Sequence, residues 1–186
     1  MLPVTPNQLT VLRMALVPLF ILLVVYSFWL WALITFLVAG VTDLLDGMIA
    51  RRWGRKTDLG TLLDPLADKL LLVSSFVLFT FSSVPLVVRL PLWLTITVIS
   101  RDLLLVGGVL VFNLTVERRA FPPSILGKAT TVSQLFLILW ALIGNTWGRT
   151  VPGHELLIWT VLGLTVTSGL HYMLQGMRLI AAEWEK

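Results

Sequence analysis

The chain has 186 residues, of which 57% are hydrophobic and only 13% charged, and its mean hydropathy is +0.92. These values exclude a soluble globular domain of ordinary composition and indicate an integral membrane protein. The formal net charge is +4 and the chain has no cysteine, so disulfides and thiolate metal sites are excluded as well.

Six apolar stretches, separated by charged residues, glycine and proline, predict an all-α membrane protein with six transmembrane helices. In chain order they cover residues 8–27, 29–52, 60–82, 90–113, 124–145 and 155–181. Each is long enough to cross a hydrocarbon core of about 30 Å, because a helix rises about 1.5 Å per residue. The spans use nearly the whole chain, so we expect a single membrane domain over residues 1–186.

The distribution of positive charge predicts the orientation of these spans. The connections after the second and fourth helices carry Arg51, Arg52, Arg55, Lys56, Arg118 and Arg119. Short loops rich in lysine and arginine face the cytoplasm, whereas the opposite loops contain only Arg89 and Arg149. With six spans, this pattern predicts that both termini are cytoplasmic.

The second predicted helix has two acidic and two small residues on one face. They are Asp43, Asp46, Gly47 and Ala50, spaced i, i+3, i+4 and i+7. An ionised carboxylate at the centre of a bilayer costs about 2.5–3.5 kcal/mol, so these acids require a counter-charge. The small residues allow a neighbouring helix or a ligand to approach the backbone closely.

The third predicted helix repeats this arrangement. Asp64 and Asp68 are four residues apart and share a face, and Gly60 lies one turn earlier. A short basic loop joins the two helices, so the two carboxylate stripes can face each other near the cytoplasmic side. Their mutual repulsion would be severe without bound cations.

Divalent cations would balance these acids. Several carboxylates without cysteine or a nearby histidine suit Mg²⁺, Mn²⁺ or Ca²⁺ and disfavour soft transition metals. Two such ions can stabilise the attacking and leaving oxygens of a phosphoryl transfer, and Arg51 beside the stripe can hold a phosphate bidentately. The alternative is a membrane cation transporter, because intramembrane acids also mark ion pathways, but the chain has no internal repeat of the kind typical of transporters.

The motif residues resemble a known signature. Asp43, Asp46, Gly47, Ala50, Arg51, Gly60, Asp64 and Asp68 fill every fixed position of DxxDGxxAR-x8-GxxxDxxxD, which is similar to the signature of the CDP-alcohol phosphatidyltransferases. Further stretches resemble landmarks of that family: PNQLTVLR near the start, SRD at 100–102, LGKATT at 126–131 and SGLHYMLQGMR near the end. The resemblance therefore extends over most of the chain.

The resemblance implies a six-helix membrane enzyme of phospholipid biosynthesis. A hydroxyl of an acceptor alcohol would attack the lipid-side phosphorus of CDP-diacylglycerol and release CMP. The implied ligands of two Mg²⁺ or Mn²⁺ ions are Asp43, Asp46 and Asp64, with Asp68 either a further ligand or the general base, and we expect it to be the base. The implied CDP-binding residues are Gly47, Ala50, Arg51 and Gly60. A homodimer in the bacterial cytoplasmic (inner) membrane, with its active site on the cytoplasmic side, is expected, and nucleic acid is not.

The acceptor is less clearly specified. Arg101, Lys128 and Arg178 are the candidate acceptor-binding residues, although Arg101 and Lys128 have alternative roles in a structural ion pair and in anchoring at the membrane interface. We predict glycerol 3-phosphate as the acceptor, as in phosphatidylglycerophosphate synthases. Phosphatidylglycerol, used by the CMP-forming cardiolipin synthases, is the alternative. The stretch SRDLLLVGG resembles the cardiolipin synthase type, because Val109 replaces an arginine found in many synthases of the other type.

Overall fold

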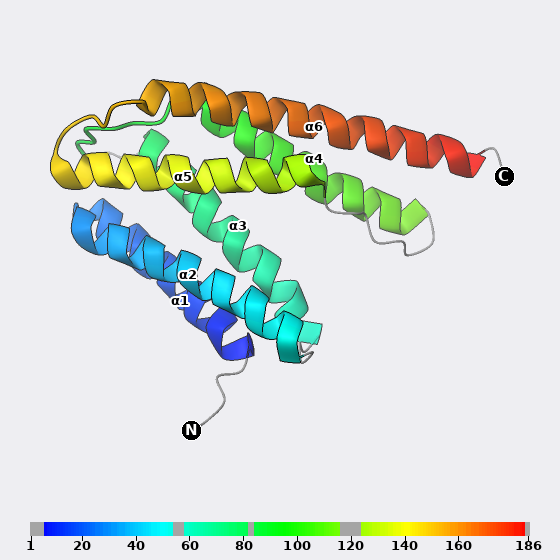
Figure 1. Cartoon of the computed structure of the whole chain (residues 1–186), viewed down its shortest axis with the longest axis horizontal. Helices are drawn as coiled ribbons and strands as arrows, with labels where there is room; N and C mark the ends of the chain where they lie inside the picture. Colours follow the sequence, from blue (N-terminus) through cyan, green and yellow to red (C-terminus); the bar gives the residue numbers. More distant parts are fainter. Residues whose placement is uncertain (1–5, 54–57, 82–83, 116–123, 185–186) are drawn as a thin grey trace. The chain divides into compact units, whose positions relative to one another are not determined.

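The described part of the chain forms helices throughout its regular structure (Figure 1). The computed structural model describes the backbone of residues 6–53, 58–81, 84–115 and 124–184, and the side chains of residues 12–43, 69–81, 84–108 and 124–177. The helices are α1 (Pro6–Val25), α2 (Trp29–Trp53), α3 (Asp58–Phe81), α4 (Leu92–Thr115), α5 (Ile125–Trp147) and α6 (His154–Trp184). The six predicted helices are therefore confirmed, with their ends shifted by a few residues.

Two stretches of helix are long and apolar enough to cross a membrane, Ile125–Trp147 and His154–Met177. Shorter apolar helical stretches cover Leu12–Val25, Trp29–Asp43 and Lys69–Phe81. These assignments come only from the side chains that the structure describes. The six-span topology and the cytoplasmic position of both termini therefore stay predictions.

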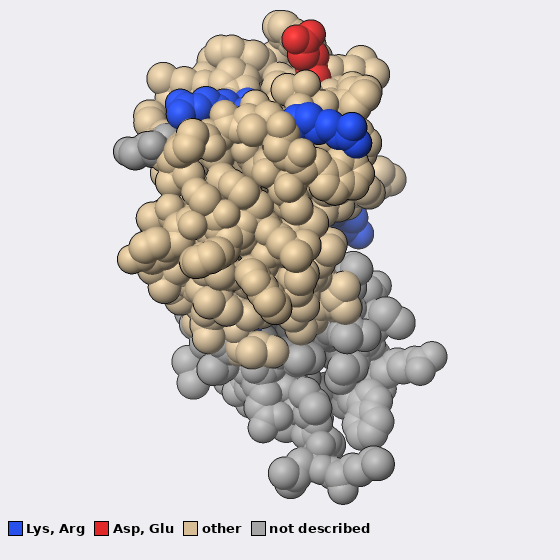
Figure 2. All heavy atoms as spheres, turned by 90° about the vertical axis from the view of Figure 1, so that its left-hand side faces the viewer, with Lys and Arg blue, Asp and Glu red and all other residues tan. Residues whose placement is uncertain are grey.

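The exposed surface is strongly apolar. Each helix exposes large hydrophobic side chains, among them Leu22, Leu30, Val77, Leu103, Phe136 and Leu156. The face in Figure 2 is dominated by uncharged side chains, with few lysines, arginines, aspartates or glutamates among the described residues. Apolar surface of this extent is unusual for a soluble monomer and suits contact with lipid.

The helices divide into two compact units, and the first contains residues Met1–Arg89 and Ile138–Val151. Here α1 packs against α2 and α3, and α1 and α2 run antiparallel side by side (Figure 1). The rings of Phe20 and Phe36 join α1 to α2 at a centroid distance of 5.8 Å, and those of Trp29 and Phe79 join α2 to α3 at 6.4 Å. Apolar packing thus fixes the end of this unit opposite the acidic motif.

A buried asparagine fastens the α3–α4 connection to the end of α5 within the first unit. Asn145 Oδ1 accepts hydrogen bonds from the backbone N–H groups of Val87 at 2.8 Å and Val88 at 3.4 Å. Its Nδ2 donates to the carbonyl of Val88 at 3.1 Å and to that of Ala141 at 2.8 Å. Buried backbone N–H and C=O groups need hydrogen-bond partners. The side chain of Asn145 supplies them for three such groups of an irregular segment.

The second unit contains residues Leu90–Leu137 and Pro152–Lys186, and α4 packs against α6 in it. Trp93 stacks on Trp159 at 5.5 Å, and Arg101 bonds to Ser168, so the two helices run parallel. The first half of α5 runs antiparallel to α6, since the N–H of Ser124 donates to Tyr172 Oη at 3.2 Å and, further along α5, Thr130 Oγ1 donates to the carbonyl of Leu164 at 3.1 Å. Polar contacts, rather than apolar packing alone, therefore specify the register of this unit.

Candidate active site

The four motif aspartates lie at two helix ends that are close in sequence. Asp43 and Asp46 belong to the C-terminal part of α2, and Asp64 and Asp68 to the N-terminal part of α3. Only residues 54–57 separate the two helices. The helical backbone at these positions confirms the spacing argument: i, i+3 and i, i+4 pairs in an α-helix lie on one face.

Asp43 is the one motif residue whose side chain the structure describes. The side chains of Asp46, Gly47, Ala50, Arg51, Gly60, Asp64 and Asp68 lie outside the described residues. Within the described side chains there is no group of three or more potential metal ligands. The predicted metal site, CDP site and general base therefore stay predictions.

Arg13 pairs with the described motif aspartate. Its Nη2 lies 3.1 Å from Asp43 Oδ1, and its side chain is 1% exposed whereas that of Asp43 is 47% exposed. The contact is between α1 and α2, which pack together along this unit. A buried guanidinium thus supplies part of the counter-charge that the acids need.

The sequence analysis missed Arg13 as a residue of the site. The signal was present, because Arg13 is a charged residue within the otherwise apolar run LTVLRMALV. An arginine inside an apolar helix normally faces an anion. Which of the chain's acids it meets depends on how α1 packs, and that packing is a property of the fold.

The chemistry of the described donor fits a hard divalent cation. Asp43 offers carboxylate oxygens, the ligands that Mg²⁺ and Mn²⁺ prefer, and its half-exposed side chain is accessible to a ligand. The arginine engages Oδ1. A cation bound by Asp43 would therefore compete with Arg13 for the same carboxylate.

Arg101 occupies a closed polar cluster in the second unit. It lies on α4 with 5% of its surface exposed, and its guanidinium donates to Asp102 Oδ1 at 2.9 Å and to Ser168 Oγ on α6 at 2.6 Å. The guanidinium carbon lies 5.7 Å from the centroid of the Tyr172 ring, within the range of a cation–π interaction. The neighbouring acid therefore neutralises this buried charge, and the serine ties it to α6.

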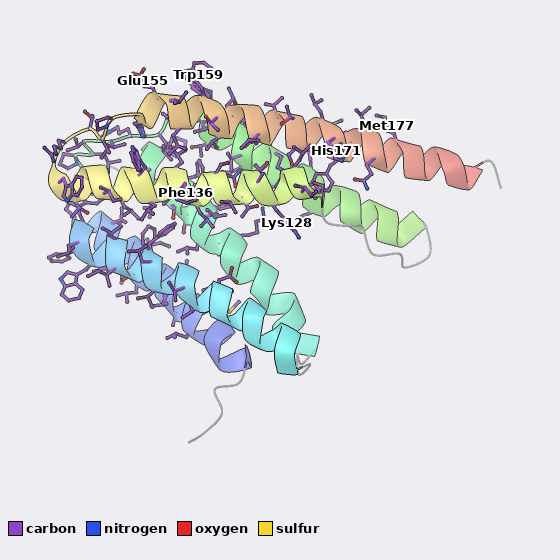
Figure 3. The ribbon with its side chains drawn as sticks, in the orientation of Figure 1. Lys128, Phe136, Glu155, Trp159, His171 and Met177 are labelled. Carbon is purple, nitrogen blue, oxygen red and sulfur yellow. The ribbon has the colours of Figure 1, made fainter. Side chains whose placement is uncertain are left out.

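Lys128 lies in the first turn of α5, and its side chain is exposed (Figure 3). The turn is capped by Ser124, whose Oγ accepts a hydrogen bond from the N–H of Gly127 at 3.0 Å. The ammonium of Lys128 is thus carried on a capped turn and is accessible to an anionic ligand. Arg178 belongs to α6, but its side chain lies outside the described residues.

The sequence comparisons agree on one kind of protein. Residues 3–167 match the family model for CDP-alcohol phosphatidyltransferases. A cardiolipin synthase (CMP-forming) of Streptomyces coelicolor is 34% identical over 96% of this chain and 85% of its own length. A CDP-diacylglycerol–glycerol-3-phosphate 3-phosphatidyltransferase of Bacillus subtilis is 32% identical, over 90% of this chain and 92% of that protein. A probable phosphatidylglycerophosphate synthase of Mycobacterium tuberculosis is also 32% identical, over 92% of this chain and 81% of its own.

Proposed function

The chain belongs to the CDP-alcohol phosphatidyltransferase family, and we propose that it transfers the phosphatidyl group of CDP-diacylglycerol to glycerol 3-phosphate. It is an enzyme of phospholipid biosynthesis that releases CMP, and the family match argues against the cation transporter considered from the sequence. The observation that carries the proposal is the complete acidic motif, which lies in the C-terminal part of α2 and the N-terminal part of α3.

In the proposed reaction, a hydroxyl oxygen of the acceptor forms a bond to the lipid-side phosphorus of CDP-diacylglycerol. The bond from that phosphorus to the oxygen of CMP breaks, and CMP leaves with the electron pair. Asp68 accepts the proton of the attacking hydroxyl as general base. The products are phosphatidylglycerophosphate and CMP, so atoms and charge balance.

The carboxylates of the motif bind two divalent cations in this proposal, Mg²⁺ or Mn²⁺. The ligands are Asp43, Asp46, Asp64 and Asp68. When bound, the cations neutralise charge on the diphosphate and on the leaving oxygen. Arg51 donates hydrogen bonds to a phosphate, and the small residues Gly47, Ala50 and Gly60 let the CDP group lie against the helix backbone.

Lys128, Arg101 and Arg178 bind the anionic acceptor in this proposal. The exposure of the Lys128 side chain supports its part, because an exposed ammonium is available to a phosphate group. Arg101 offers a further hydrogen-bond donor, because its Nε has no hydrogen-bond partner among the described residues. A phosphate would satisfy such a buried donor.

One observation favours phosphatidylglycerol as a second candidate acceptor. Asp102 already neutralises Arg101, so little positive charge is left to balance an acceptor. The phosphodiester of phosphatidylglycerol carries a single negative charge and needs less compensation than the phosphate monoester of glycerol 3-phosphate. The Streptomyces coelicolor relative is named as a cardiolipin synthase. Removal of positive charge near Lys128 would therefore affect the use of the two acceptors to different extents.

We further propose that the protein crosses the bacterial cytoplasmic (inner) membrane six times and acts as a homodimer. The basic connections support this orientation, with both termini and the acidic motif on the cytoplasmic side. CDP-diacylglycerol would then reach the site from the inner leaflet.

An acceptor panel tests the proposed function. The full-length protein, purified in detergent with Mg²⁺ or Mn²⁺, is incubated with CDP-diacylglycerol and either glycerol 3-phosphate, phosphatidylglycerol, inositol phosphate or serine. We expect CMP release with glycerol 3-phosphate and loss of release when the metal is chelated. Release with phosphatidylglycerol alone would select the second candidate, and no release with any acceptor would refute the transferase assignment.

A further inference from the structure

Tyr172 links three helices of the second unit. Its hydroxyl accepts a hydrogen bond from the backbone N–H of Ser124, at the start of α5, at 3.2 Å. The guanidinium of Arg101 on α4 lies over its ring, and the same guanidinium bonds to Ser168, one turn before Tyr172 on α6. The tyrosine is therefore held on one side by α4 and holds the start of α5 on the other.

Ser124 transmits this contact to the first turn of α5. Its Oγ accepts from the N–H of Gly127 at 3.0 Å, and its carbonyl accepts from the N–H of Lys128 at 3.2 Å. The first N–H groups of a helix have no partner within the helix, so this residue determines where the helix begins. Because the Ser124 N–H is bonded to Tyr172, the turn that carries Lys128 is attached to α6 as well as capped locally.

Gly127 shows how close the hydroxyl approaches this turn. A Cβ atom at Gly127 would lie 2.8 Å from Tyr172 Oη and 3.2 Å from Ser124 Oγ. The tyrosine hydroxyl would therefore have to shift, and the serine oxygen would have to move by a few tenths of an ångström. The absence of a side chain at Gly127 therefore allows the close contact between α5 and Tyr172, and the next residue in the chain is Lys128.

We propose that Tyr172 is a positioning residue for the acceptor: through Ser124 it fixes the first turn of α5, so that the ammonium of Lys128 is held where the acceptor anion binds. This inference rests on the proposed function. A lysine side chain is long and mobile, so the anchoring of its backbone limits the space that its ammonium samples. Tyr172 itself does not contact the reacting atoms.

The matched pair Tyr172→Phe and Tyr26→Phe tests the inference. The first substitution removes the hydroxyl but keeps the ring beneath Arg101, and the second makes the same change at the chain's other tyrosine, which is 67% exposed between α1 and α2. With the acceptor that the wild-type protein uses, we expect Tyr172→Phe to raise the acceptor KM about three- to tenfold, as for the loss of one hydrogen bond. The KM for CDP-diacylglycerol should not change, and Tyr26→Phe should match the wild type.

A glycine pair gives an independent test by displacing the hydroxyl without removing it. Gly127→Ala introduces the methyl group that Tyr172 Oη excludes, whereas Gly163→Ala introduces one on α6, where nothing lies within 4 Å. We expect Gly127→Ala to raise the acceptor KM in the same way and Gly163→Ala to leave it unchanged. Equal acceptor KM values for the two variants would contradict the inference.

Amide hydrogen exchange separates failure of the inference from failure of the proposed function. Exchange at the start of α5 should be faster in Tyr172→Phe than in Tyr26→Phe, at an unchanged thermal midpoint. A wild-type protein that releases CMP, with an acceptor KM that Tyr172→Phe does not change, overturns the inference alone. A rise in both substrate KM values together with a lower thermal midpoint also overturns it, because the role would then be purely structural. A wild-type protein that releases no CMP with any acceptor refutes the function on which the inference rests.

Discussion

Replacement of Arg13 should reveal whether Asp43 binds a metal ion. In the structure the buried guanidinium contacts Asp43 Oδ1 at 3.1 Å, so a cation that binds this carboxylate must compete with the arginine. In Arg13→Gln that competition is lost. We therefore expect the variant to be less stable than the wild type without metal, and to bind Mn²⁺ more tightly.

The size of the effect follows from the exposure of the pair. Breaking a fully buried ion pair costs about 3–5 kcal/mol, whereas an exposed pair contributes about 0–1 kcal/mol. Here one side chain is 1% and the other 47% exposed, so solvent screens the pair partly and about 1–2 kcal/mol is a reasonable value. In the variant the arginine no longer competes for Asp43. A gain of about 1–2 kcal/mol in the free energy of metal binding corresponds to an affinity about five- to thirtyfold higher.

Two measurements test this prediction on the full-length protein in detergent. Electron paramagnetic resonance of a Mn²⁺ titration gives the affinity, and thermal unfolding with and without metal gives the stability. Because a ligand at one hundred times its Kd stabilises the folded state by about 2.7 kcal/mol, metal should stabilise Arg13→Gln more than the wild type. The difference in thermal midpoint between the two proteins should therefore shrink as the metal is added.

The control is Arg89→Gln, the same change at an exposed arginine of the α3–α4 connection in the same unit. It should alter neither the Mn²⁺ affinity nor the response of stability to metal. An affinity of Arg13→Gln equal to or below that of the wild type would refute the reasoning. Asp43 would then not be a metal ligand that Arg13 competes for.

Two further substitutions give clear expectations. Asn145→Ala should lower the free energy of unfolding by about 2–4 kcal/mol, because three backbone groups of the α3–α4 connection lose their partner. The control Thr146→Ala removes only a bond within α5 and should cost less than about 1 kcal/mol. Equal denaturation midpoints of the two variants would contradict this role of Asn145. Asp68→Asn should lower the turnover at least about a hundredfold while the protein still binds CDP-diacylglycerol, as expected for loss of a general base. Equal loss of turnover and binding would contradict the role of general base and leave Asp68 as a metal ligand only.

The helices and the acidic motif were predictable because both are encoded by local periodicity. Apolar stretches of sufficient length define the six helices, and intervals of three and four residues place Asp43 with Asp46 and Asp64 with Asp68. These patterns depend only on the geometry of one helix. The sequence therefore predicted which helices carry the acidic motif before any packing was known.

Contacts between helices were not predictable in the same way. Asn145 bonds to Val88, 57 residues away, and Tyr172 bonds to Ser124, 48 residues away. Asparagine, serine and tyrosine in apolar helices usually bond to some backbone or side-chain group, so their types alone do not identify the partner. The partner is chosen by the register in which the helices pack, and no short-range pattern encodes that register.

The two buried arginines show why the fold adds information about function. Arg101 pairs with its neighbour in sequence, Asp102, and the two side chains are 6% and 8% exposed. Arg13 pairs across two helices with Asp43, which is 47% exposed. A buried carboxylate is shielded from a metal ion, whereas a half-exposed one is accessible to it. We therefore expect a response to metal at Arg13, whose partner Asp43 stays accessible to a ligand, and none at the buried pair of Arg101 and Asp102.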